Sequence, residues 1–224
     1  MARKIGAITV GQAPRVDVLP DMEPILQGIE VLQRGALDGM TKAELQAIVP
    51  AEGDYVLVTR LCDGSSVHIA EKHILPRIQN HITHLVEEEG VDGILMLCTG
   101  EFPRFECAVP LLYPQVLLQY FTMGVLGQRV LGVMTPAAEQ IPQSTRRWHA
   151  NGAENVLVNA ASPYASFDLV VEKAAELKAA GAQLLVMDCI GYTQAMKEAI
   201  RSKTGLPVVL GRTVAAHAAA ELFG

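Results

Sequence analysis

Two apolar stretches of this 224-residue chain end in the same way: GILMLCTG at residues 93–100 and QLLVMDCIG at residues 183–191. In each stretch an apolar run leads to a cysteine, and a glycine follows two positions later. The two cysteines, Cys98 and Cys189, are 91 residues apart. We predict that each lies at the carboxyl end of a buried strand and that the two face each other across a cleft between similar halves.

The rest of the chain alternates between strand-like and helix-like patterns. Further apolar strands are predicted at residues 5–10, 29–32, 55–59, 67–69, 129–134, 155–158 and 207–210. Helices are predicted at residues 17–27, 41–44 onward, 71–89, 115–126, 136–149, 167–180, 193–203 and 213–222. Apolar strands that alternate with helices are typical of parallel sheets covered on both faces.

This order of elements occurs twice. We therefore predict an α/β protein of two pseudo-symmetric lobes, each a mostly parallel sheet flanked by helices, with the active site between them. The first lobe is predicted to comprise residues 1–103 and 206–224, and the second residues 104–205. Asp63-Gly64 predicts a tight hairpin turn within the first lobe.

Composition excludes several classes of protein. Half the residues are hydrophobic and the net charge is −6, which disfavours a general nucleic-acid binder. The chain shows neither a signal-peptide pattern near Met1 nor an apolar run of about 18 residues, so we expect a cytoplasmic protein without a membrane span. Thiols stay reduced there, and without CxxC spacing we expect four free cysteines and no metal site.

The standard nucleotide and hydrolase motifs are missing from the sequence. There is no GxGxxG after a strand, no GxxxxGK[ST] and no GxSxG. This disfavours nicotinamide enzymes, P-loop kinases and α/β-hydrolases, and we expect no cofactor.

Two thiols on opposite walls of a cleft suit inversion at a carbon next to a carboxylate. One thiolate removes the proton from one face and the other thiol returns a proton to the opposite face. Cys98 and Cys189 are accordingly the predicted catalytic residues. The alternative is that both are small buried hydrophobic residues at strand ends.

Ligands bind outside the carboxyl ends of strands in open α/β sheets, which identifies candidate substrate-binding residues. Arg15, after the first strand, is the best candidate to hold a carboxylate, unless it is a solvated surface residue. Thr9 and Gln12 are candidate donors beside it, and Arg60 is a second candidate cation. The remaining candidates follow the later strands: Thr99, Gly100, Thr135, Gly191 and Tyr192.

Each of these later residues also has a structural interpretation. Thr99 and Thr135 can cap helices, and Tyr192 can serve in packing. Strand alternation points Asp188 away from the cleft, so we expect it to be structural. Among the other residues of chemical interest, Arg104 and Arg212 are interpreted as surface or interface residues, and Cys62 and Cys107 as packed thiols.

Four segments resemble one protein family: ITVGQAPR at residues 8–15, the Asp63-Gly64 turn, DCIGY at 188–192 and AAAEL at 218–222. They are similar to the AroM family within the aspartate/glutamate racemase superfamily. The resemblance implies a two-lobed fold and a racemase or isomerase that acts through paired cysteines without pyridoxal phosphate. Its substrate is expected to be a small carboxylate-bearing metabolite.

The residues after the cysteines differ from the better-known racemases, in which Asn-Thr typically follows the first cysteine and Thr the second. Here they are Thr99-Gly100 and Ile190-Gly191. A single-cysteine decarboxylase, a C–N lyase or hydrolase, and a non-catalytic metabolite-binding protein therefore stay open as alternatives. The apolar helix at 115–126 is either an interface or core, and a homodimer is the commoner state of such enzymes.

Overall fold

The computed structural model describes residues 3–224 and divides them into two units. The first unit contains the described residues up to Pro114 together with Ala215–Gly224, and the second is Gln115–Val214. Both boundaries lie later in the chain than residues 103 and 205. Strand β6 (Leu111–Leu112) pairs with the first sheet and strand β10 (Val208–Leu210) with the second, which accounts for the difference.

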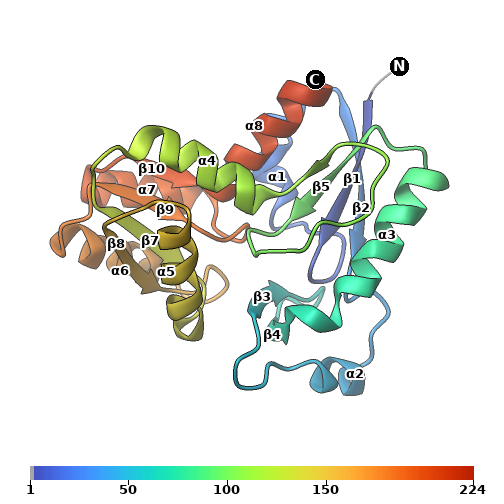
Figure 1. The fold of residues 1–224 in the computed structure, drawn as a ribbon, viewed down its shortest axis with the longest axis horizontal. Coiled ribbons are helices and arrows are strands. Elements are labelled where there is room, and N and C mark those ends of the chain that lie inside the picture. The colour runs from blue at the N-terminus through green and yellow to red at the C-terminus, as the bar shows by residue number, and fades with distance from the viewer. Residues whose placement is uncertain (1–2) are drawn as a thin grey trace. The chain divides into compact units, whose positions relative to one another are not determined.

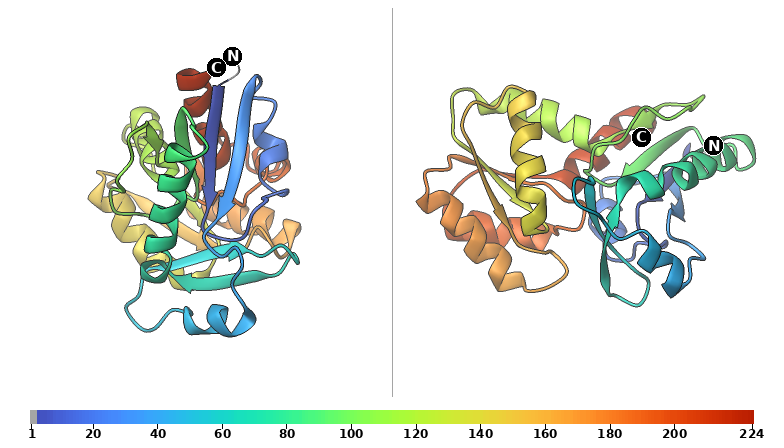
Figure 2. Two further views of the ribbon diagram at one scale, coloured as in Figure 1. Left: turned by 90° about the vertical axis from the view of Figure 1, so that its right-hand side faces the viewer. Right: turned by 60° about the horizontal axis from the view of Figure 1, so that its bottom comes forward.

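The first unit is built on a four-stranded parallel sheet in the order β2-β1-β5-β6 (Figure 1). Its strands are β1 (Arg3–Thr9), β2 (Ile29–Gly35), β5 (Gly93–Leu97) and β6. Helix α3 (Leu75–Glu87) lies along this sheet and contacts β1 (Figure 2, left). Its residues Ile78, Ile82 and Leu85 are buried in one core with strand residues Ile8 and Met96.

The remaining elements of the first unit are short, except for the last helix. They are α1 (Leu19–Met22), α2 (Lys42–Ala47), β3 (Val56–Arg60), β4 (Ser66–Ala70), the 3-10 turn η1 (Glu71–His73) and α8 (Gly211–Phe223), which ends in this unit. Strands β3 and β4 form the predicted antiparallel hairpin around Asp63-Gly64. Prolines limit the predicted helices 17–27 and 71–89 to α1 and α3, since proline is tolerated only at a helix start.

The second unit repeats the strand order of the first. Its parallel sheet runs β8-β7-β9-β10, which matches β2-β1-β5-β6 strand for strand. The strands are β7 (Leu131–Thr135), β8 (Val156–Ala160), β9 (Leu184–Met187) and β10, and the helical elements are α4 (Pro114–Leu126), η2 (Ala138–Gln140), α5 (Ile141–Ala150), α6 (Phe167–Ala179) and α7 (Gln194–Thr204). Two flanked parallel sheets confirm the predicted α/β fold.

Alternating strand residues enter the two cores of the second unit. Leu185, Met187 and Leu210 pack with α6 and α7, whereas Leu184, Val186 and their neighbours pack with α4 and α5. Because both faces are covered, β9 is buried at every position, as a parallel strand between two helix layers must be.

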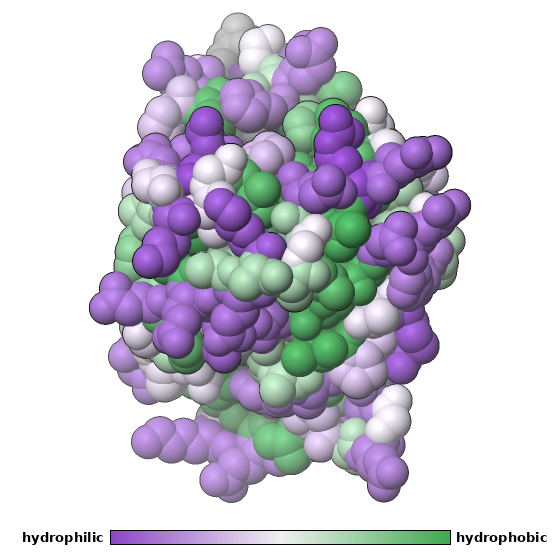
Figure 3. Space-filling model, turned by 90° about the vertical axis from the view of Figure 1, so that its left-hand side faces the viewer, coloured by the Kyte–Doolittle hydropathy of each residue, from purple (hydrophilic) through white to green (hydrophobic). Residues whose placement is uncertain are grey.

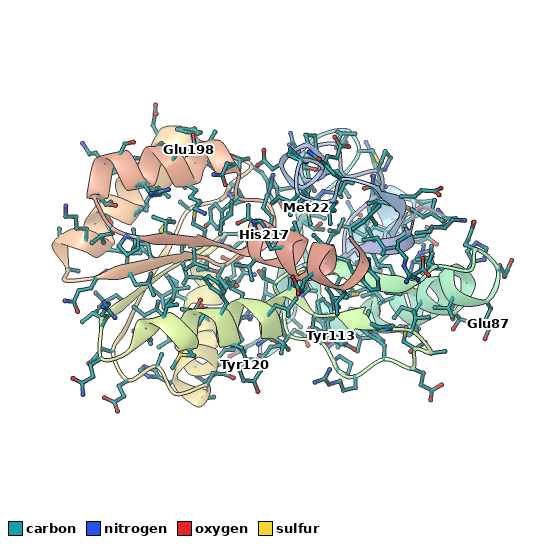
Figure 4. The ribbon with its side chains drawn as sticks, turned by 90° about the horizontal axis from the view of Figure 1, so that it is seen from above. Met22, Glu87, Tyr113, Tyr120, Glu198 and His217 are labelled. Atoms are coloured by element: carbon teal, nitrogen blue, oxygen red, sulfur yellow. The ribbon has the colours of Figure 1, made fainter. Side chains whose placement is uncertain are left out.

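The outer face of α4 is apolar but exposed. Tyr120, which is labelled in Figure 4, is 77% exposed, and Phe121 and Val125 are about half exposed. Elsewhere polar side chains cover most of the face seen in Figure 3, with apolar residues in patches between them. Among residues 3–224, the longest apolar helix falls short of what a bilayer crossing requires.

Gly11 provides a test of the packing between the loop after β1 and strand β3. A Cβ at Gly11 would lie 2.5 Å from the Arg60 carbonyl oxygen and 2.3 Å from Thr59 Oγ1. We expect Gly11→Ala to lower the free energy of unfolding by about 1–3 kcal/mol, because backbone must move to admit the methyl group. Chemical denaturation measures the change.

Gly124→Ala is the matched control. Gly124 lies within α4, and a Cβ there meets nothing within 4 Å. This substitution should stabilise the protein by up to about 1 kcal/mol through helix propensity. Equal effects of the two substitutions would contradict the close approach at Gly11.

Candidate active site

Cys98 directly follows strand β5. Its side chain is buried, with 9% of the residue exposed, and the backbone N–H of Gly100 donates to its Sγ at 3.3 Å. A Cβ at Gly100 would lie 2.5 Å from Leu57 Cδ2, so this turn requires a glycine or a local shift. The sulfur therefore has a fixed place at the carboxyl end of a central strand.

Cys189 occupies the equivalent place after β9. It is 7% exposed, and the backbone N–H of Gly191 donates to its Sγ at 3.4 Å. A Cβ at Gly191 would lie 2.4 Å from the Tyr164 hydroxyl oxygen. The two Cys-x-Gly turns thus share both the position in their sheets and the hydrogen bond from glycine to sulfur.

This hydrogen bond has a chemical consequence. A backbone N–H directed at a sulfur stabilises negative charge on it, and the thiolate is the basic and nucleophilic form of cysteine. Both turns are therefore suited to hold a thiolate. Proton abstraction by such a group requires a substrate C–H within reach of the sulfur.

Arg15 is buried rather than solvated, with 3% of the residue exposed. Its Nε and Nη2 donate to the two carboxylate oxygens of Asp17, each at 2.8 Å, and its Nη1 donates to Thr9 Oγ1 at 3.0 Å. Thr9 pairs with Leu97, the residue before Cys98. The predicted anion-binding residue thus lies one strand from Cys98, and its guanidinium group already binds the carboxylate of Asp17.

The pKa of Asp17 reflects this arrangement. Burial alone would raise the pKa of the carboxyl group, but the hydrogen bonds and charge of Arg15 outweigh burial and lower it below 3.8. Asp17 is therefore ionised at neutral pH.

Gln12 and Arg60 help to line one pocket of the first unit. The pocket has a volume of about 250 Å³ and includes Arg15, Asp17 and Cys62 in its wall. The Gln12 side-chain oxygen accepts from the Cys62 backbone N–H at 2.8 Å, and Arg60 Nε donates to the Gly64 carbonyl at 3.1 Å. The structure thus brings together four predicted binding residues: Thr9, Gln12, Arg15 and Arg60.

Cys62 differs from the prediction of a packed thiol. It is exposed, and its Sγ lies 3.4 Å from the Ala13 carbonyl. Cys107 is half-buried against the core of the first unit, as predicted. Thr99, beside Cys98, is 4% exposed.

The candidates of the second unit surround the Cys189 turn. Tyr192 is fully buried and its hydroxyl donates to the Ala161 carbonyl at 2.7 Å, so it ties the turn to the loop at residues 161–166. Burial raises the pKa of Tyr192 well above 10.0, and nearby negative charge adds to this shift. Thr135, at the end of β7, is buried and its hydroxyl donates to Gln140 Oε1 at 3.2 Å.

Asp188 faces the side of its sheet that α5 covers, away from the core that contains Cys189, as strand alternation predicts. Its carboxylate accepts from Trp148 Nε1 at 3.0 Å and pairs with Arg147. Both partners belong to α5. This buried pair fixes the end of β9 immediately before Cys189.

The interpretation of Arg212 as a surface or interface residue is wrong. It is 1% exposed, and it donates from Nε to the Ile190 carbonyl at 3.0 Å and from Nη2 to the Gly191 carbonyl at 2.9 Å. The sequence could have indicated this role for Arg212, because Arg212 follows the end of β10 by two residues. Residues just after the carboxyl ends of strands were the candidates among which Arg15 was selected. Arg104, by contrast, is exposed and lies over the Tyr113 ring at 5.1 Å.

Among the described residues, no group of three or more His, Cys, Asp or Glu side chains is arranged to hold a metal ion.

Comparison with solved structures identifies the fold independently. Unliganded arylmalonate decarboxylase superposes with a TM-score of 0.63 at 12% identity, covering 99% of this chain and 93% of that chain. Aspartate racemase from Picrophilus torridus gives 0.61 at 14% identity, with coverages of 98% and 94%. Maleate isomerase Iso from Pseudomonas putida S16 gives 0.61 at 11% identity, with coverages of 98% and 92%.

At these identities the likeness establishes the fold. The comparison with curated protein sequences gives no match. A family model described as AroM protein matches residues 5–223, which is nearly the whole chain. The chain therefore belongs to the AroM family and has the fold of the aspartate/glutamate racemase superfamily.

Proposed function

We propose that this protein is a cofactor-independent racemase or isomerase of a small carboxylate-bearing substrate, with Cys98 and Cys189 as its two proton-transfer groups. The observation that carries the proposal is the equivalence of the two Cys-x-Gly turns. Each follows the corresponding strand of a sheet with the same strand order, and each sulfur accepts a glycine N–H.

Both proton transfers of the proposed reaction are made by the two thiols alone. A cysteine thiolate takes the proton from the carbon next to the carboxylate, and the electron pair of the broken C–H bond delocalises into that carboxylate. The other thiol then gives its proton to the opposite face of the carbon. After one turnover the protonation states of the two cysteines are exchanged, so the enzyme is ready for the opposite enantiomer.

We assign the anchoring of the substrate carboxylate to Arg15, with Thr9, Gln12 and Arg60 beside it. Support comes from the buried guanidinium that lines the pocket of the first unit together with a second arginine. Two guanidinium groups against the one carboxylate of Asp17 leave these three side chains with a net positive charge, which favours a monoanionic group. Thr99, Gly100, Thr135, Gly191 and Tyr192 are assigned to the walls around the two thiols.

A second candidate uses Cys189 alone. The hydrogen bonds of Arg212 to the turn after Cys189 favour it, because a cation beside this turn stabilises the thiolate that remains after the thiol has given up its proton. In such a decarboxylase the substrate would lose carbon dioxide, and the Cys189 thiol would give its proton to the resulting carbanion. Both reactions need reduced thiols, from which we infer a cytoplasmic location.

Solvent deuterium incorporation separates these candidates. A panel of aspartate and glutamate enantiomers, allantoin, maleate and an arylmalonate is first tested for turnover by NMR in D₂O. For a racemised substrate, the product of wild-type turnover should carry one deuteron at the inverted carbon. Cys98→Ser and Cys189→Ser should each lower the racemisation rate by about 10²–10⁴-fold, because each removes one proton-transfer group.

Cys107→Ser is the control, since this half-buried thiol lies outside both turns; its activity should stay near wild type. Full activity in both catalytic-cysteine variants would rule out the two-thiol reaction. Release of carbon dioxide that depends on Cys189 alone would establish the single-cysteine reaction. Ligand binding without any turnover, indifferent to both substitutions, would identify a binding protein.

Asp17→Asn tests the role of Arg15. The substitution removes the negative charge that competes with a substrate carboxylate for the Arg15 fork, so KM should fall about threefold or more. Loss of the charge-assisted bonds should lower the free energy of unfolding by about 1–3 kcal/mol. Steady-state kinetics and chemical denaturation measure the two effects.

The stability effect should depend on pH in a defined direction. The folded-state pKa of Asp17 is lower than its ordinary value of 3.8, so its contribution is complete above that value and is lost as pH falls through the folded pKa. The difference between wild type and Asp17→Asn should therefore shrink in acid. Glu52→Gln, an equal charge change at an exposed site, is the control; the assignment of Arg15 is wrong if Asp17→Asn leaves KM unchanged.

A further inference from the structure

Arg212 contacts two consecutive peptide groups of the turn after Cys189. Its Nε donates to the Ile190 carbonyl at 3.0 Å and its Nη2 to the Gly191 carbonyl at 2.9 Å. The side chain comes from the first turn of α8, and only 1% of the residue is exposed. A buried guanidinium is thus committed to backbone oxygens rather than to solvent.

The same two peptide groups point their N–H bonds back at Cys189. The Gly191 N–H, in the peptide whose carbonyl belongs to Ile190, donates to Cys189 Sγ at 3.4 Å. The Tyr192 N–H, in the peptide whose carbonyl belongs to Gly191, donates to the Cys189 carbonyl at 3.3 Å. One peptide group therefore connects the guanidinium of Arg212 directly to the sulfur.

We propose that Arg212 is a positioning residue that stabilises the Cys189 thiolate through the Ile190–Gly191 peptide. A donor on the carbonyl oxygen polarises the peptide and strengthens the hydrogen bond that its N–H makes, an effect that a low-dielectric interior enhances. Arg212 also fixes the plane of that peptide, so that the N–H keeps its direction toward Sγ. The inference rests on the proposed function only in that Cys189 reacts as a thiolate.

The other ionisable groups near the turn do not replace this contribution. Asp188 precedes Cys189 and carries a negative charge that opposes a thiolate, but its carboxylate is paired with Arg147 and Trp148. Tyr192 has its pKa raised by burial first and by the Cys189 charge second, so it is neutral. The Tyr164 ring packs over Gly191. Arg212, by contrast, is a cation hydrogen-bonded to the turn itself.

The test is the pH dependence of alkylation at Cys189, measured by peptide mass spectrometry with iodoacetamide. In Arg212→Met the titration midpoint of Cys189 should rise by about one pH unit, and the rate at pH 7 should fall about tenfold. Arg212→Lys keeps the charge but cannot make both hydrogen bonds in the same geometry, so it should give an intermediate shift. Arg201→Met, the same charge change at an exposed site on α7, should leave the midpoint unchanged.

Trp148 reports whether the variants fold. It is the chain's single tryptophan and is fully buried in the second unit, so its fluorescence emission should match wild type in a folded variant. An unchanged Cys189 midpoint in folded Arg212→Met would overturn the proposal. Equal shifts of the Cys189 midpoint in Arg212→Met and Arg201→Met would also overturn it, because the loss of any positive charge would then explain the shift.

A measurement on the unsubstituted protein covers the case in which the variants do not fold. The ¹⁵N resonances of the Gly191 amide and of Arg212 Nε should both move with pH, at the same midpoint as Cys189 alkylation. Resonances that do not follow this titration would contradict the connection through the peptide. None of these readouts uses a substrate, so a failure of the proposed racemase activity and a failure of the Arg212 role are distinguishable.

Discussion

The hydrogen bond from a glycine N–H to a cysteine sulfur two residues earlier is the constraint on which both candidate catalytic turns depend. It requires the chain to reverse immediately after a buried strand, and a side chain at the glycine would collide with Leu57 in one turn and Tyr164 in the other. The strand before each turn is buried on both faces, so it holds the cysteine backbone in place. The buried strands thus fix the backbone positions of the two candidate catalytic cysteines.

The two halves have a common plan but unequal lengths. Thr9 and Thr135, at the ends of equivalent strands, are 126 residues apart, whereas the cysteines are 91 apart. The 35 additional residues of the first half include α2 and the β3–β4 hairpin. That hairpin contributes Arg60 and Cys62 to the pocket beside Arg15, so the insertion accounts for much of the chemical difference between the halves.

The sequence predicted an element well wherever its residue pattern is compatible with only one kind of secondary structure. Continuous apolar runs identified the central strands, and the spacing of Ile78, Ile82 and Leu85 identified α3. The partners of the buried charged side chains were beyond prediction, because the contacts of Arg15, Asp188 and Arg212 depend on how loops close in three dimensions. Asp17 is only two residues from Arg15, yet nothing in that spacing distinguishes a paired arginine from a solvated one. The first predicted boundary missed β6, because a two-residue strand has little pattern of its own. The strand at 207–210 was predicted, but it was assigned to the first unit, whereas β10 pairs with β9 in the second.

The loop at residues 161–166 is attached to the Cys189 turn at two points. Tyr192 donates to the Ala161 carbonyl, and the Tyr164 ring lies against Gly191. Neither contact involves the sulfur, so residues of this loop can change in size while the cysteine, its glycine donor and the strand beneath them stay the same. Under the proposed function, this loop is therefore where relatives with the same Cys-x-Gly turn can diverge in the substrates that they accept.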